Sequence, residues 1–494
     1  MTLAIIHSRS NQGIDAPAVT VEVHLSNGLP ALNIVGLPET AVRESKDRVR
    51  SALLNAHFEF PPRRITINLA PADVPKEGSR YDLPIALGIL AASGQLPTNT
   101  LTGYEFLGEL ALTGELREIE GVLPAAMACG TAGRNLLVPT ANGPEAALAG
   151  KTAVYPAAHL LEVCAHLRGA APLQPMSPGQ FRRGSSGGPD MADVIGQHQA
   201  RRALEVAAGG RHNLLFSGPP GAGKTLLASR LPGIMPSLEE ETALEVASIY
   251  SVAGLGLRRD FHQPPFRSPH HTSSGAALVG GGTLPRPGEI SLAHRGVLFL
   301  DELPEFPRKV LEVLREPMES GEIHLSRVRA RTTYPAAFML VAAMNPCPCG
   351  YLGQERCRCT PDAVRRYRAR ISGPLLDRID LQVQVLPVPR KELLARESAT
   401  GEPSAPIRKR VEIARRVQME RQGRANGDLE AGELDRYCRL GKAQRQLAET
   451  AMEKLDLSAR GYHRVLRVAR TIADLAASKT IETPHLSEAL GYRF

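Results

Sequence analysis

Tryptophan is absent from this chain of 494 residues, and aromatic residues make up only 4% of it. Proteins that hold nucleic acids by stacking bases on aromatic rings depend on such side chains. The shortage argues against a site in which base stacking dominates. If the chain binds a nucleic acid, we expect cations to contact the phosphate backbone, an interaction that weakens as the salt concentration rises.

A long apolar run is also missing. No stretch reaches the roughly 20 apolar residues that a membrane-spanning helix needs. The start, MTLAIIHSRSNQG, has no long apolar segment and no signal-peptide cleavage site. We therefore expect a cytoplasmic protein with no membrane partner.

The residues that are present give an ordinary globular balance with an excess of cations. Hydrophobic residues make up 43% of the chain and charged residues 22%, and the formal net charge is +8. This balance is compatible with a polyanionic partner, although many basic proteins bind none.

The length predicts about three domains, and the composition indicates where they lie. Residues 1–170 have the pattern of an α/β domain, and residues 171–190 are rich in Pro, Gly and Ser, which is typical of a linker. Residues 191–396 alternate short apolar runs with helical patterns, which predicts a parallel sheet. We expect a second linker at residues 397–406 and an all-α domain at residues 407–494. The predicted fold class is therefore α/β with a helical C-terminal domain.

Four segments of the first domain have clear patterns. Apolar and polar residues alternate over residues 19–25, and an Asn-Gly pair and a second apolar stretch follow, which predicts a β-hairpin. Thr40–Asn55 has apolar residues on one helical face. Ile65–Pro71 is typical of a strand, and Leu83–Ala92 is apolar all round, which is typical of a buried helix.

The motif GPPGAGKT lies between the apolar run NLLFS and the helical pattern LLASRL. Strand, glycine-rich loop and helix form the context of a phosphate-binding P-loop, in which backbone N–H groups and the helix dipole hold the anion. We expect Lys224 to reach the β- and γ-phosphates of ATP and Thr225 to bind Mg²⁺. A chance glycine-rich turn is the weaker alternative. The expected nucleotide-binding residues are Gly218, Pro219, Pro220, Gly221, Ala222, Gly223, Lys224 and Thr225.

Two later apolar strands end in polar residues. GVLFLDE ends in Asp301, which can hold the Mg²⁺ shell, and Glu302, which can polarise the attacking water. FMLVAAMN ends in Asn345, which can sense the γ-phosphate because open α/β sheets place ligands at the carboxyl ends of strands. The alternatives are a strand that ends at a polar turn and a turn-forming Asn before Pro346.

Four of the seven cysteines crowd into one short segment, and in a reducing compartment such clustering favours metal ligation over disulfides. Two C-x-C pairs can close a tetrahedral Zn²⁺ site, which would be structural because it leaves no open position. Surface thiols or redox pairing are the alternative. The candidate ligands are Cys347, Cys349, Cys357 and Cys359.

These motifs together resemble AAA+ ATPases, in the branch of magnesium chelatase motor subunits and minichromosome-maintenance helicases. DVIGQ (193–197) and SGPLLDRIDL (372–381) add to the match. The stretches VHLSNGLPALNIVGLPE, NLAPADVPKEGSRYDLPIALGILAASGQLP and NPCPCGYLG resemble the ComM/YifB family over nearly the whole chain. The resemblance implies a homo-hexamer that uses ATP and Mg²⁺ to move branched or single-stranded DNA. Members of the family are associated with branch migration during recombination of incoming DNA in natural transformation.

The resemblance also implies roles for single arginines. Arg378 would be an arginine finger that reaches a neighbouring subunit's ATP, and the alternative is a surface arginine paired with Asp377 or Asp380. Arg460 matches the second sensor of the lid helix best, with Arg464 as the alternative. Both could instead belong to a solvated helix face.

In the helicases that the chain resembles, a hairpin before the first sensor grips DNA in the central channel. Glu319–Pro335 is typical of two short strands around a basic tip, and a strand would direct alternate residues to one face. An exposed edge strand blunted by charge is the alternative. The glycine-rich segment Pro269–Glu289, with its His pair, is typical of an insertion loop and not of a metal site. The DNA-binding candidates are Arg327, Arg329 and Arg331.

PADVPKEGSRYDLP resembles the domain shared by Lon proteases and RadA-type recombination proteins. Lon-type enzymes cut peptides with a Ser–Lys dyad. Here Arg80 takes the place of the nucleophile, with Ser79 one position early, and Leu123 lies near the place of the lysine. A serine with no nearby base is a poor nucleophile, so we expect no protease activity.

Three functions are thus in competition. A DNA translocase is favoured by the basic candidates and by the full-length resemblance. A chelatase-like motor that remodels a protein partner is the second, and an ATP-dependent protease is the weakest.

Overall fold

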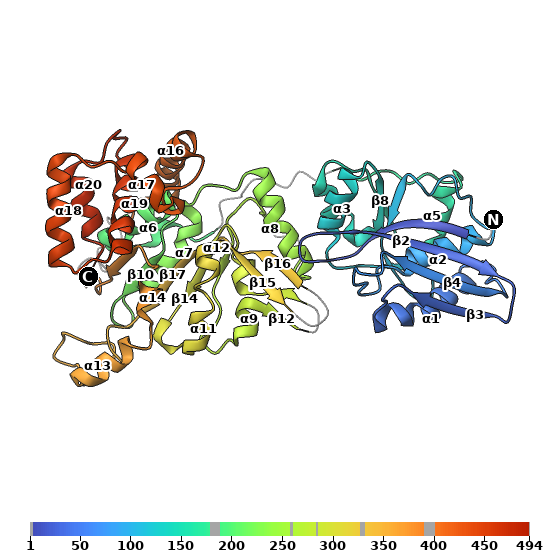
Figure 1. Cartoon of the computed structure of the whole chain (residues 1–494), viewed down its shortest axis with the longest axis horizontal. Helices are drawn as coiled ribbons and strands as arrows, with labels where there is room; N and C mark the ends of the chain where they lie inside the picture. The colour runs from blue at the N-terminus through green and yellow to red at the C-terminus, as the bar shows by residue number, and fades with distance from the viewer. Residues whose placement is uncertain are drawn as a thin grey trace.

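The protein is elongated and has three parts in chain order (Figure 1). This computed structural model describes residues 3–177, 188–256, 260–282, 285–326, 331–389 and 401–493. An N-terminal α/β part, a central α/β part and a helical C-terminal part follow one another along the long axis. The predicted α/β fold class with a helical end is confirmed. None of the described helices combines the length and hydropathy of a membrane span.

The N-terminal part is built on a mixed seven-stranded sheet of order β3-β4-β2-β1-β5-β8-β9. The predicted hairpin over β2 and β3 is wrong, because β4 lies between these strands, antiparallel to β2 and parallel to β3. The strands are β1 (Leu3–Arg9), β2 (Ala18–Ser26), β3 (Ala31–Val35), β4 (Arg64–Ala70), β5 (Tyr104–Phe106), β8 (Asn135–Pro139) and β9 (Val154–Ala157), with the small ribbon β6 (Glu109–Leu110) and β7 (Leu116–Arg117) beside them.

Helices complete the core of this part. α1 (Thr40–Asn55) buries the predicted face, with Val42, Val49 and Leu53 inaccessible to solvent. Every residue of α2 (Asp82–Ala92) is buried, as its apolar sequence predicts. The remaining helices are α3 (Val122–Thr131), α4 (Gly143–Ala146) and α5 (Leu160–Leu167).

The central part contains the predicted parallel sheet, of order β11-β14-β17-β10-β18. Its strands are β10 (Leu214–Ser217), β11 (Phe266–Arg267), β14 (Val297–Leu300), β17 (Met339–Met344) and β18 (Leu381–Gln384), all paired in parallel. Helices α6 (His198–Gly210), α7 (Lys224–Ile234) and α8 (Glu240–Val252) belong to this part, as do the short helices α9 (Gly275–Val279), α10 (Glu289–Leu292), α11 (Arg308–Glu312), α12 (Pro317–Ser320), α13 (Pro361–Arg368) and α14 (Gly373–Leu376).

A shared apolar core joins the first two parts. α3 packs on α8, and Val122 and Ala126 lie in one cluster with Ala243 and Ala247. The backbone N–H of Gly121 also donates to the Ser251 carbonyl across the junction (3.0 Å). The N-terminal part is therefore docked on the central part by burial as well as by the chain connection.

Two antiparallel ribbons lie on the side of the central part that faces the N-terminal part (Figure 1). The predicted strands around the basic tip are present as β15 (Glu322–Ser326) and β16 (Arg331–Pro335). Arg331 begins β16, whereas Arg327 and Arg329 lie outside the described residues. The second ribbon is β12 (Gly280–Gly281) with β13 (Arg286–Pro287).

The C-terminal part begins earlier than predicted. Its first helix starts at Ser404, inside the segment assigned to a second linker, because the helix tolerates Pro406 in its first turn, where backbone N–H groups have no helical partner. The start of the first linker segment also packs, since Met176 N donates to the Val154 carbonyl (2.8 Å). The C-terminal helices are α16 (Ser404–Gln422), α17 (Ala431–Tyr437), α18 (Lys442–Lys454), α19 (Ala459–Leu475) and α20 (Thr483–Leu490).

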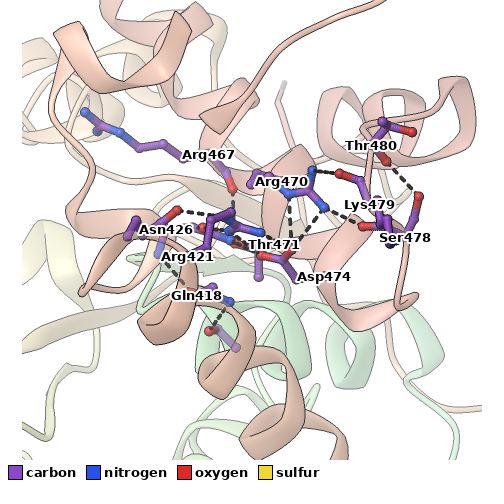
Figure 2. Close-up of polar contacts among 12 residues, drawn as sticks. Gln418, Arg421, Asn426, Arg467, Arg470, Thr471, Asp474, Ser478, Lys479 and Thr480 are labelled. Atoms are coloured by element: carbon purple, nitrogen blue, oxygen red, sulfur yellow. Dashed lines mark hydrogen bonds and ion pairs between the residues drawn. The ribbon is translucent and has the colours of Figure 1, made fainter. Parts of the chain in front are cut away.

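A buried polar cluster ties the C-terminal helices together (Figure 2). The Asp474 carboxylate on α19 accepts hydrogen bonds from Arg421 on α16, from Arg470 one turn before it, and from Asn426, at 2.7–3.1 Å. The Asp474 side chain is only 1% exposed. The cluster therefore links α16 to α19 through one buried carboxylate.

Candidate nucleotide-hydrolysis site

The P-loop follows β10 directly and leads into α7. Gly221 and Gly223 have φ values of 76° and 90°, a left-handed region that favours glycine. A side chain at Gly218 would collide with the Val385 carbonyl. The glycine spacing is thus required by the backbone path, which leaves room for phosphate oxygens at the amino end of α7.

Lys224 is buried at the centre of this loop. Its ammonium donates to the carbonyls of Gly218 (2.7 Å) and Pro219 (3.0 Å) and to Asn345 Oδ1 (3.0 Å). Burial lowers the pKa of Lys224, and the carboxylates of Asp301 and Glu302 oppose that shift. The lysine and the asparagine, 121 residues apart in the chain, therefore face one point.

Thr225 and Asp301 meet on the other side of the loop. The Thr225 hydroxyl donates to Asp301 Oδ2 at 2.6 Å, although the residues come from α7 and from the end of β14. A hydroxyl and a carboxylate are hard oxygen donors of the kind that Mg²⁺ prefers beside phosphates. This pair fits a magnesium ion.

Glu302 is held by a histidine that the sequence did not single out for this role. His271 Nδ1 lies 3.3 Å from Glu302 Oε2, and the Glu302 backbone has a φ of 53°. His271 comes from the insertion loop, so the predicted loop forms part of this site. Only its proximity in space, and no sequence motif, identifies it.

The predicted cysteines form one compact cluster. The sulfur atoms of Cys347 and Cys349 are 3.4 Å apart, and those of Cys349 and Cys357 are 3.7 Å apart. All four Sγ atoms, that of Cys359 included, lie within 4.8 Å of one another. Four sulfurs around Zn²⁺ at about 2.3 Å would be about 3.8 Å apart, so the donor set fits that ion. Cys129, Cys164 and Cys438 are buried, as expected of small apolar residues.

Arg378 lies near the amino ends of the sheet strands, whereas the P-loop lies at their carboxyl ends. Its carbonyl accepts a hydrogen bond from Asn213 Nδ2 (2.9 Å), just before the amino end of β10, whereas the P-loop follows the carboxyl end. Four strand residues span about 13 Å. Arg378 therefore does not serve the P-loop of its own chain.

The side chain of Arg378 is 7% exposed. Nη1 donates to the Pro374 carbonyl (2.7 Å), and Nη2 pairs with the Glu319 carboxylate. Within the described residues this ion pair replaces the pairing with Asp377 or Asp380 that the alternative interpretation expected.

Both candidates for the second sensor lie beside Arg378. Arg460 and Arg464, from α19, line the same cavity. Arg464 Nη1 donates to Asp380 Oδ1 (2.6 Å) and to the Arg378 carbonyl (3.0 Å), whereas Arg460 is exposed. The structure therefore brings the three arginines together, but away from the P-loop of the same chain.

The protease-like segment has a different set of contacts from a Ser–Lys dyad. The Ser79 hydroxyl pairs with Glu109, and Arg80 Nη1 donates to Asn11 Oδ1 (2.8 Å). Leu123 is buried in the core shared with α8, and the Lys76 ammonium donates to the Pro71 carbonyl.

Three family descriptions match the chain in order. "Subunit ChlI of Mg-chelatase" matches residues 21–142, "Magnesium chelatase, subunit ChlI" matches residues 190–393, and "Magnesium chelatase, subunit ChlI C-terminal" matches residues 401–493. The second match contains the P-loop, the acidic pair, Asn345 and Arg378.

Individual relatives match over different lengths. YifB of Salmonella typhimurium is 52% identical over 495 residues, which cover 100% of this chain and 97% of YifB. The competence protein ComM of Haemophilus influenzae is 51% identical over 498 residues, with 100% and 98% covered. The magnesium-chelatase 67 kDa subunit of Chlorobaculum parvum is 26% identical over 161 residues, which cover 31% of this chain and 23% of that subunit.

Proposed function

This chain belongs to the ComM/YifB family of magnesium-chelatase-like AAA+ proteins, and from that premise we propose that it is an ATP-driven motor that moves DNA. One observation carries the ATPase assignment: Lys224 bonds to Asn345, and Thr225 bonds to Asp301, around a single cavity. This arrangement joins a phosphate-binding lysine to residues at the ends of two other strands.

Each residue has a distinct task in the proposed hydrolysis. Lys224 holds the β- and γ-phosphates, and Asn345 contacts the γ-phosphate. Thr225 and Asp301 hold Mg²⁺, which when bound neutralises charge on the phosphate oxygens. Glu302 orients a water and accepts its proton as the water oxygen bonds to the γ-phosphorus and the bond to the ADP oxygen breaks.

A hexameric ring is part of the proposal, because Arg378 can act only on the nucleotide of a neighbouring chain. The full-length likeness to a competence protein supports DNA as the substrate, in branch migration of incoming DNA. The net charge of +8 is consistent with phosphate-backbone contacts. Remodelling of a protein partner is the second candidate, favoured by the three chelatase descriptions.

ATP hydrolysis by the purified chain tests the proposal. We expect stimulation by forked or four-way-junction DNA over the rate without DNA, and a loss of about a hundredfold in Glu302→Gln because the proton acceptor is removed. Phosphate release should be compared without DNA and with single-stranded, duplex and branched DNA. Hydrolysis that ignores every DNA would favour the protein-remodelling candidate.

We expect His271→Ala to raise the rate without DNA up to about fivefold, because a polar contact that solvent reaches holds Glu302 by at most about 1 kcal/mol. Freed from His271, Glu302 can turn toward the attacking water. His24→Ala is the control, since His24 is an exposed histidine of β2 in the N-terminal part. An unchanged or lower rate in His271→Ala alone would contradict this role.

We also propose that the four cysteines hold one structural Zn²⁺. Purified protein should contain about one zinc per chain by elemental analysis, because four thiolates close a tetrahedral site. Cys357→Ser with Cys359→Ser should lose the metal, whereas Cys438→Ser, a buried thiol elsewhere, should keep it. A zinc content far below one per chain after growth with added zinc would refute the site.

A further inference from the structure

The segment between Asn345 and Arg378 contains a basic projection that the proposed hydrolysis does not use. We call residues 346–372 the arginine arm. Its helix, α13, extends away from the body of the central part (Figure 1). The arm has no lysine and only two acidic residues, Glu355 and Asp362. Its arginines, all exposed, are Arg356, Arg358, Arg365, Arg366, Arg368 and Arg370.

Most arginines of the arm form no ion pair or only an exposed ion pair that contributes little to stability. Arg365 and Arg366 pair with Asp362 on the same helix, each at 3.2 Å, and all three side chains are more than half exposed. Such exposed pairs contribute at most about 1 kcal/mol. In the described part of the chain, no ion pair engages Arg358 or Arg368. The arm therefore presents a net positive surface that folding does not require.

The arm is also held in shape at its base. Cys347 is fully buried, and the four sulfur atoms gather at the point where the arm leaves the sheet. The Arg356 guanidinium carbon lies 3.8 Å from the centre of the Tyr351 ring. α13 buries Val364 and Tyr367, and Tyr367 belongs to an apolar core of the central part, so the arginines of the helix face outward. A preorganised surface loses less entropy when it binds a partner.

Both ends of the arm lie next to the proposed ATP site. Asn345, which bonds to Lys224, directly precedes it, and a side chain at Gly350 would collide with Pro220 of the P-loop. At the far end, Arg370 Nη1 donates to Glu305 Oε2 (3.0 Å), three residues after Glu302. A partner bound to the arm would therefore act on both the P-loop side and the Glu302 side of the site.

We propose that the arginine arm is a DNA contact, distinct from the hairpin that the sequence suggests, and that it binds the phosphate backbone irrespective of sequence. This inference rests on the proposed DNA motor. Exclusive use of arginine fits phosphate, because the planar guanidinium binds it through two parallel N–H bonds whereas a lysine offers a point charge. The scarcity of aromatic rings likewise favours backbone contacts over base stacking.

A quadruple variant of the full chain tests the proposal: Arg358→Ala, Arg365→Ala, Arg366→Ala and Arg368→Ala. DNA affinity, measured by fluorescence anisotropy near physiological salt, should fall at least about tenfold. Its dependence on salt should also become shallower, because binding through fewer phosphate contacts releases fewer counterions from the DNA. The matched control removes four exposed cations of the C-terminal part: Arg436→Ala, Arg439→Ala, Lys442→Ala and Lys454→Ala. The control should bind DNA as the unaltered chain does.

Each outcome decides one point. If the unaltered chain binds no DNA, the proposed motor function fails and the arm proposal with it. If the unaltered chain binds DNA and the quadruple variant binds equally well, only the arm proposal is overturned. If mass photometry shows that the variant has lost its assembly, the arm contacts a neighbouring chain and the DNA assignment is overturned. Weaker binding by an intact assembly, with the control unaffected, supports the proposal.

Discussion

Replacing Arg378 with Ala is expected to lower ATP hydrolysis by about three orders of magnitude or more, because an arginine at the γ-phosphate stabilises the charge of the transition state by that amount. The P-loop of the same chain should stay intact, since Arg378 lies at the opposite end of the sheet strands. Nucleotide binding and phosphate release, measured separately, should show near-normal binding and lost turnover.

Mixing two inactive variants tests whether the arginine acts between chains. Arg378→Ala chains keep Glu302, and Glu302→Gln chains keep Arg378. In a mixed ring, the ATP site of an Arg378→Ala chain, which keeps Glu302, can face the intact Arg378 of a Glu302→Gln chain. Part of the ATP hydrolysis should therefore return. If the arginine served its own chain, every site in the mixture would lack one group and no activity would return.

Glu319→Gln separates this role from a structural one. Arg378 is 6% exposed and pairs with Glu319, so its loss could act by disturbing the local fold. The Glu319 side chain is 58% exposed, and a glutamine there keeps an oxygen that can accept the hydrogen bond from Arg378 Nη2. We expect Glu319→Gln to keep hydrolysis within about fivefold. If it loses as much activity as Arg378→Ala, the ion pair matters and the finger assignment is wrong.

The meeting of the candidate nucleotide-site residues was largely predictable because each of them lies in a contiguous motif at the end of a strand. Lys224, Asp301 and Asn345 follow apolar runs that the parallel sheet aligns, so their meeting follows from the fold class. The contact of His271 with Glu302 was not predictable in this way. A long insertion has no periodic pattern that fixes where its side chains lie.

The errors in the fold have a related cause. The Asn-Gly pair predicts only a local turn. In the structure β4 pairs with β2 along its length, from Thr20 opposite Ala70 to Ser26 opposite Arg64, so β3 cannot lie beside β2 at that edge. Such a long-range pairing outweighs the preference of one turn, and the sequence of residues 19–35 alone does not predict it. Composition likewise marked residues 397–406 as a linker, although the first turn of a helix accepts the same residues.

Asp474→Ala is expected to destabilise the C-terminal part by about 3–5 kcal/mol, because it leaves buried cations without their partner. The Arg470 side chain is 4% exposed and pairs with Asp474 at 2.9 Å. Burial lowers the pKa of Arg470, and Asp474 opposes that shift. Thermal unfolding, with hydrogen exchange of α19 to locate the change, should show the loss.

Arg424→Ala is the matched control for that change, since it removes two ion pairs that solvent reaches. Arg424 Nη1 lies 3.5 Å from Glu430 and 3.6 Å from Glu433, and its side chain is 43% exposed. Its loss should cost less than about 1 kcal/mol. If Asp474→Ala costs no more than this, the cluster in Figure 2 does not hold α16 and α19 together. A large loss confined to these helices would mean instead that the position of Arg464 beside Arg378 depends on a buried charge at the other end of α19.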